Sequence, residues 1–123
     1  MKMEPARRCE MIDTLRREGA RGAWLMLLEA ILVLAGPLAR FERHGERPWS
    51  SATFSGARHS FRLSFDDPAA VAAGEAFIAA LPDHEFVLRR GLVADATIAA
   101  VEHAPFGHPQ MIVDAELLVL EEA

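Results

Sequence analysis

The feature that most constrains the fold of this chain is the run AWLMLLEAILVLA over residues 23–35, in which Glu29 is the only ionisable residue. The run stops at Gly36-Pro37, a pair that is typical of a helix end. A helix that rests on a sheet needs only one apolar stripe, but this predicted helix is apolar on all sides. We therefore expect its outer face to be covered by another part of the chain, by a second subunit or by lipid.

A second subunit is the cover that we favour for this helix. A membrane span needs about 20 apolar residues, and the run is shorter, so the sequence argues against membrane contact. A secretory signal is a poor match because the basic region before the run is long and contains acidic residues. The candidate interface residues are Trp24, Leu27, Ile31 and Leu34.

Residues 48–66 alternate in polarity around the sequence FSGARH, which predicts a two-stranded hairpin. Glycine at the first central position favours a type II′ turn, so we place the turn at Gly56-Ala57. In this register Phe54 lies opposite His59 on an apolar face. The serines, Arg58 and Arg62 lie on the other face.

Two further elements follow this hairpin. Residues 67–82 predict a helix, with Asp67 as its N-cap, Pro68 in its first turn and Pro82 at its end. Residues 85–122 alternate over two long stretches and predict a second hairpin, in which Ile98 pairs with Ala115. The outer face of this hairpin is only half polar, so part of it is expected to meet a partner.

The element order helix, helix, hairpin, helix, hairpin predicts a single α+β domain over residues 1–123. It comprises an N-terminal helical segment (1–38), followed by the first hairpin, a helix and the second hairpin. The expected architecture has two layers, an antiparallel four-stranded sheet with helices on one face. Strand order is not readable from the sequence.

The net charge of −5 is unevenly distributed. Residues 1–62 contain 11 Lys and Arg against 7 Asp and Glu, and residues 63–123 contain 2 against 11. An acidic chain is a poor general ligand for nucleic acid, so we expect no such partner. The charges of the two halves can neutralise each other within the fold, or they can direct head-to-tail association of two chains. Alternatively, the basic half can bind an anionic ligand.

The segment RFERHGERPW, residues 40–49, places arginines beside a tryptophan on the polar face, a combination typical of interaction hot spots. The interpretation that we favour is a loop in which Trp49 covers the open end of the sheet and the arginines balance nearby acidic residues. His59 lies on the apolar face, either bonded to a carbonyl at the edge of the core or at the mouth of a pocket. The candidate binding residues are Arg43, His44, Arg47, Trp49 and His59.

No motif in the chain specifies a reaction. The five histidines do not follow known zinc spacings, and no serine lies in a nucleophile elbow. We therefore predict no catalytic residues, no metal site and no cofactor. The single cysteine, Cys9, excludes an intrachain disulfide and favours a reducing, cytoplasmic location.

These observations favour a small non-enzymatic protein that self-associates, most simply as a dimer, or that acts as a binding module. Its partner would be an acidic protein or a small ligand at the basic segment. The alternative is a small enzyme or ligand carrier. Its apolar pocket would lie between helix 23–35 and the sheet, with His59 at the pocket mouth.

Overall fold

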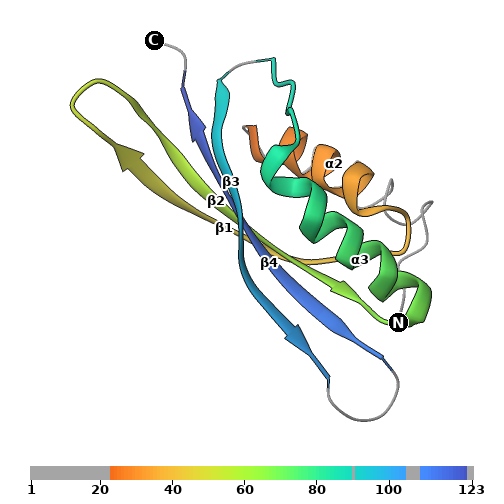
Figure 1. Cartoon of the computed structure of the whole chain (residues 1–123). Helices are drawn as coiled ribbons and strands as arrows, with labels where there is room; N and C mark the ends of the chain where they lie inside the picture. The colour runs from red at the N-terminus through yellow and green to blue at the C-terminus, as the bar shows by residue number, and fades with distance from the viewer. Residues whose placement is uncertain (1–22, 90, 105–108, 122–123) are drawn as a thin grey trace, which may run out of the picture.

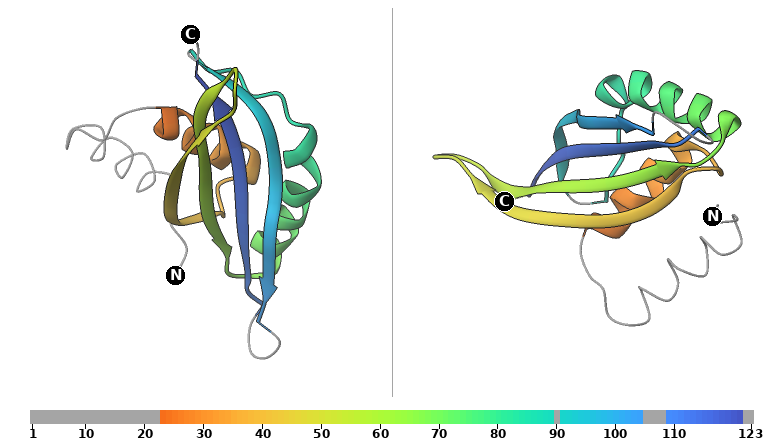
Figure 2. Two further views of the ribbon diagram at one scale, coloured as in Figure 1. Left: turned by 90° about the vertical axis from the view of Figure 1, so that its left-hand side faces the viewer. Right: turned by 90° about the horizontal axis from the view of Figure 1, so that it is seen from below.

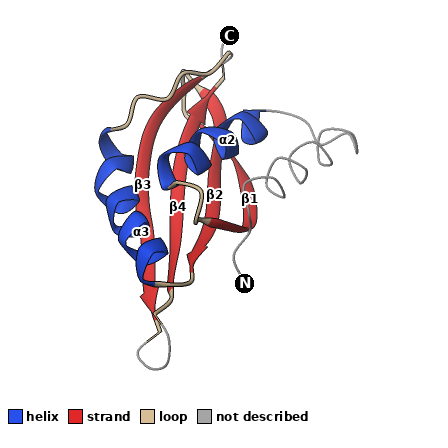
Figure 3. Cartoon of the chain, turned by 90° about the vertical axis from the view of Figure 1, so that its right-hand side faces the viewer, coloured by secondary structure: helices blue, strands red, loops and turns tan. Residues whose placement is uncertain are grey.

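The computed structural model describes residues 23–89, 91–104 and 109–121. Its elements are, in order, helix α2 (Ala23–Ala35), strands β1 (Arg40–Ser50) and β2 (Ser55–Phe65), helix α3 (Pro68–Ala80), the 3₁₀ turn η1 (Leu81–Asp83) and strands β3 (Leu92–His103) and β4 (Met111–Leu120). The four strands form one antiparallel sheet in the order β1-β2-β4-β3, and both helices lie on the same face of it (Figures 1 and 3). The predicted two-layer α+β fold is confirmed. The first predicted helix falls in residues 1–22, outside the described residues.

The core lies between the helices and one face of the central strands β2 and β4. The first turn of α3 is capped as predicted, because the Asp67 carboxylate accepts a hydrogen bond of 2.8 Å from the backbone N–H of Ala70. Gly74 allows the helix to pack closely, since a Cβ there would overlap the side chain of Met111 and lie 2.9 Å from the Phe65 ring. The face of α3 that carries Ala70, Gly74 and Phe77 is therefore buried in the core.

Helix α2 is covered mainly by its own chain, which differs from the cover that we favoured from the sequence. Leu27 and Ile31 are fully buried between the sheet and the rest of the core, so they present no surface to a second subunit. Trp24 and Leu34 are half-buried against the same core. Only Val33, 83% exposed, has a large apolar side chain in this helix that points to solvent. Packing against α3 and the sheet covers enough of α2 to accommodate an almost uniformly apolar sequence.

The first hairpin is longer than predicted, and its turn lies elsewhere. Residues 51–54 connect the strands, and Pro48 lies opposite Ala57. The prediction of a turn at Gly56-Ala57 is therefore wrong. Gly56 is required for a different reason: a Cβ there would overlap the carbonyl oxygen of Val119, so the residue marks the close approach of β2 to β4.

The alternation predicted for β2 itself is confirmed. His59, Phe61, Leu63 and Phe65 are buried on the helix-covered face. Their partner strand is the segment 40–50, which the sequence analysis treated largely as a loop. Its arginines, glycine and proline suit an edge strand that must not pair with other chains.

The second hairpin has the predicted register at its centre, where Ile98 lies opposite Ala115. Register shifts between Val93 and Asp95 and between Ile98 and Ala100 alter the alternation on either side. As a result Val101 lies opposite Val113 on the inner face. The strand also begins at Leu92, later than the expected start near residue 85.

We expect the replacement Ile31→Ala to lower the free energy of unfolding by about 2–5 kcal/mol, because it opens a cavity in the core. The matched change Val33→Ala, two residues further along α2 and on its solvent-exposed side, should change it by less than about 0.5 kcal/mol. Urea denaturation followed by circular dichroism measures both. Equal effects of the two variants would contradict the observed cover of α2.

A second pair of variants tests the position of Gly56. Gly56→Ala should lower the free energy of unfolding by about 1–3 kcal/mol, because the added methyl group meets the β4 backbone. Gly45→Ala meets only the hydroxyl of Ser60, at 2.7 Å, which can rotate away, so its effect should be smaller. If both variants unfold at the same urea concentration, Gly56 is not at a close strand contact.

Candidate functional site

The register of β1 against β2 divides the five predicted binding residues between the two faces of the sheet. His44 lies opposite Phe61 and therefore shares the helix-covered face with His59. The other three lie on the outer face, opposite outer-face residues of β2: Arg43, Arg47 and Trp49. The structure thus contains two candidate sites, one on each face.

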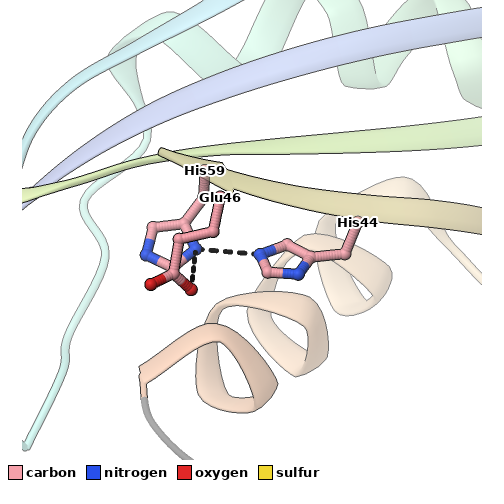
Figure 4. A group of neighbouring side chains, drawn as sticks. All are labelled: His44, Glu46 and His59. Atoms are coloured by element: carbon pink, nitrogen blue, oxygen red, sulfur yellow. Dashed lines mark hydrogen bonds and ion pairs between the residues drawn. The ribbon is translucent and has the colours of Figure 1, made fainter. Parts of the chain in front are cut away.

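On the inner face the two histidines contact each other directly. His44 Nε2 and His59 Nδ1 are 2.9 Å apart, so one ring donates an N–H and the other accepts with its lone pair (Figure 4). The carboxylate of Glu46 lies on the same side, with Oε1 3.7 Å from His59 Nδ1. We refer to His44, Glu46 and His59 as the histidine cluster.

Aromatic rings surround this cluster. Trp24, at the start of α2, stacks on His44 with ring centroids 4.4 Å apart and planes inclined by 11°. Phe61 contacts the same imidazole at a centroid distance of 4.9 Å. His59 is only 4% exposed, whereas the Glu46 side chain is about half exposed. The cluster is therefore closed on the side of the helix and open to solvent at Glu46.

Burial disfavours the charged form of both imidazoles and so lowers the pKa of His44 and of His59 below the usual value of 6.5. The nearby His59 lowers the pKa of His44 further, and Glu46 opposes the shift in both rings. Both rings are therefore neutral at neutral pH. A neutral imidazole can take part in a His–His hydrogen bond, and it can donate a lone pair to a ligand.

His44 and His59 were each predicted from the sequence as candidate binding residues, but neither their contact nor the role of Glu46 was predicted. Residues 44 and 46 share a face only if this segment is a strand, and Glu46 then lies opposite His59. The sequence H-G-E, residues 44–46, was the available signal, because in a strand its first and third side chains lie on the same face. The carbonyl partner expected for His59 is replaced by the ring of His44.

The outer face is dominated by ion pairs across the middle of the sheet. Arg62 donates two hydrogen bonds, of 2.8 and 3.0 Å, to the carboxylate of Asp114. This bidentate contact lowers the pKa of Asp114. Arg47 lies 3.6 Å from Glu116. These pairs join β2 or β1 to β4 and neutralise part of the charge there.

The charged residues are sorted by strand across the whole sheet. Strands β1 and β2 contain five arginines and two glutamates, whereas β3 and β4 contain four acidic residues and neither lysine nor arginine. Figure 2 shows, in its left panel, the face of the sheet opposite the helices; no described helix covers this face. The charge split seen in the sequence therefore becomes a basic half and an acidic half of one sheet.

Comparisons with known proteins place the fold but not the activity. No protein-family model matches the chain, and no curated protein does. One chain of a solved structure described as "Virion of native gene transfer agent (GTA) particle" aligns with 86% of this chain and 91% of its own length. The TM-score is 0.54 and the sequence identity 20%. At this identity the likeness concerns the fold.

Among the described residues, neither helix has the length and apolar character of a membrane span.

We expect the free energy of unfolding to fall as pH falls below about 6.5. In the unfolded chain the histidines bind protons in this range, whereas the folded pair, with its lowered pKa values, binds fewer. The stabilisation is therefore present above the unfolded pKa and is lost as pH falls towards the folded one. Urea midpoints between pH 7.5 and 5.5 measure the effect.

The double variant His44→Gln/His59→Gln is the comparison for this measurement. The free energy of unfolding of this variant should depend much less on pH between 7.5 and 5.5. Any contribution from the Arg62–Asp114 pair appears at lower pH, because the carboxylate of Asp114 titrates there. A double variant with the same slope as the parent between pH 7.5 and 5.5 would show that other groups cause the dependence.

Proposed function

We propose that this chain is a structural subunit that self-associates, most simply as a dimer, through the helix-free face of its sheet. The observation that carries the proposal is the division of this face into a basic half and an acidic half. A surface of this kind is complementary to itself. Charge complementarity of this sort directs association and sets the relative orientation of the partners.

The geometry of a symmetric pair follows from the strand order. If two copies face each other about a two-fold axis parallel to the strands, β1 of one copy lies over β3 of the other. Arg43 and Arg58 of one copy then approach Asp95 and Glu102 of its partner. Arg43, Asp95 and Glu102 lie on the two edge strands, β1 and β3, and Arg58 lies on the central strand β2, opposite Arg47.

Apolar residues on the same face support a protein partner. Trp49, Ile112 and Leu120 lie on the outer face and are half-buried. Tryptophan and arginine are the residues most enriched at the centre of protein interfaces. The likeness to a chain of a virion particle supports the same proposal, since a virion is an assembly of protein chains.

The alternative of a ligand carrier has less support. The space that its pocket would need between α2 and the sheet is filled by Leu28, Ile31 and Phe61, which are essentially inaccessible to solvent. Packing of this density leaves room for a ligand only if the core rearranges. We therefore place the binding function on the outer face.

Charge reversal with complementation tests the proposal. Arg43→Glu/Arg58→Glu and Asp95→Arg/Glu102→Arg should each weaken self-association at least tenfold, because each makes the two halves of the face repel. Mixed in equal amounts, the two variants should associate again, since each altered half meets its new complement. Sedimentation velocity at micromolar concentration, at low and at high salt, measures these changes.

The control is Glu75→Arg/Asp83→Arg, which alters the net charge as Asp95→Arg/Glu102→Arg does but lies in α3 and η1, at exposed positions. It should leave self-association unchanged. A parent protein that is monomeric throughout, a control that dissociates as strongly as the test variants, or variants that stay monomeric when mixed would each overturn the proposal.

A further inference from the structure

The histidine cluster has the composition and the spacing of a metal site. We propose that His44 Nε2, His59 Nδ1 and a carboxylate oxygen of Glu46 bind one divalent transition-metal ion, for which Zn²⁺ is the best match. Two imidazoles and one carboxylate are ligands that zinc commonly takes in proteins. The site lies on the helix-covered face, so it does not depend on the self-association proposed for the other face.

The three donor atoms already lie close to the required positions. All three are within 4.8 Å of one another. Zinc bonds of about 2.0–2.2 Å place neighbouring ligand atoms of a tetrahedral site roughly 3.4 Å apart. The His44–His59 distance of 2.9 Å must therefore open slightly, and the Glu46–His59 distance of 3.7 Å must close slightly. Each of these two adjustments amounts to a few tenths of an ångström, and a rotation of the half-exposed Glu46 side chain brings its carboxylate, which lies within 4.8 Å of the His44 donor, to the remaining position.

The backbone holds these donors on rigid elements. His44 and Glu46 are two residues apart on β1, and Glu46 lies directly opposite His59 on β2, so all three side chains project from one patch of paired strand. Stacking of Trp24 restricts the His44 ring. Binding sites built on paired strands retain their geometry better than sites on loops.

Metal binding would replace the His–His hydrogen bond by two bonds to the ion. The ring that donates its N–H in that bond moves its proton to its other nitrogen, leaving a lone pair on each facing nitrogen. Glu46 supplies the negative charge and lies at the half-exposed side, through which an ion can enter. Three protein ligands leave a fourth position for water or another small ligand.

The side chains around the cluster distinguish it from a chance gathering of surface residues. His59 is buried, and both imidazoles are packed against aromatic rings, so the two nitrogens face each other rather than solvent. The acidic residue is the exposed member. An ion bound here would connect β1 and β2 at the point where Trp24 of α2 contacts the hairpin.

Titration of the EDTA-treated full chain with Zn²⁺ tests the proposal, by calorimetry and by native mass spectrometry. We expect one ion per chain and a rise in melting temperature, because an ion that binds only the folded state stabilises it. Co²⁺ in place of Zn²⁺ should give the visible absorption of a cobalt ion with nitrogen ligands. Glu46→Gln should weaken binding at least tenfold, and His44→Gln should weaken it more.

Glu46→Gln is the decisive variant, because the Glu46 side chain is half exposed and its loss should not prevent folding. His84→Gln, which removes an exposed histidine outside the cluster, is the matched control and should bind Zn²⁺ as the parent does. Zinc affinity that is unchanged in both His44→Gln and Glu46→Gln, or equally reduced in His84→Gln, would overturn the assignment. So would the absence of binding by the parent chain at 100-fold molar excess of Zn²⁺.

Discussion

The packing of α2 into the concave face of the sheet is the interaction on which the other features depend. Leu27, Leu28 and Ile31 fill the centre of the core, opposite the buried side chains of β2 and β4. Burial on this scale supplies the main driving force for folding. The packing of α2 also determines which face of the sheet is covered by the chain itself and which face is left for other contacts. In addition, it brings Trp24 onto the imidazole of His44.

The register of β1 on β2 then determines which side chains of β1 lie on each face of the sheet. Neighbouring residues of a strand point to opposite faces, so the arginines of β1 and the pair His44 and Glu46 are divided by the strand pairing alone. Arg43 and Arg47 go to the outer face, and His44 and Glu46 go to the inner one. A shift of β1 by one residue would place Arg43 and Arg47 against the core and His44 in solvent, away from His59, and neither site would exist.

The strand order converts a charge split along the sequence into a charge split across a surface. Because β4 lies between β2 and β3, the acidic hairpin meets the basic hairpin at the centre of the sheet, where Arg62 and Asp114 pair. Pairs of this kind at the surface contribute little individually. The charges farther from the centre are positioned to act between molecules, which is the basis of the proposed self-association.

Local patterns in the sequence predict the two-layer fold, the helix that begins after Asp67, the alternation of β2 and the pairing of Ile98 with Ala115. Each of these depends on periodicity or on capping, which act over a few residues. Long-range packing, by contrast, establishes the partner of β2, the cover of α2 and the contact between His44 and His59. These depend on which distant segments meet, and an edge strand rich in polar residues carries too weak a periodic signal to reveal its partner from sequence.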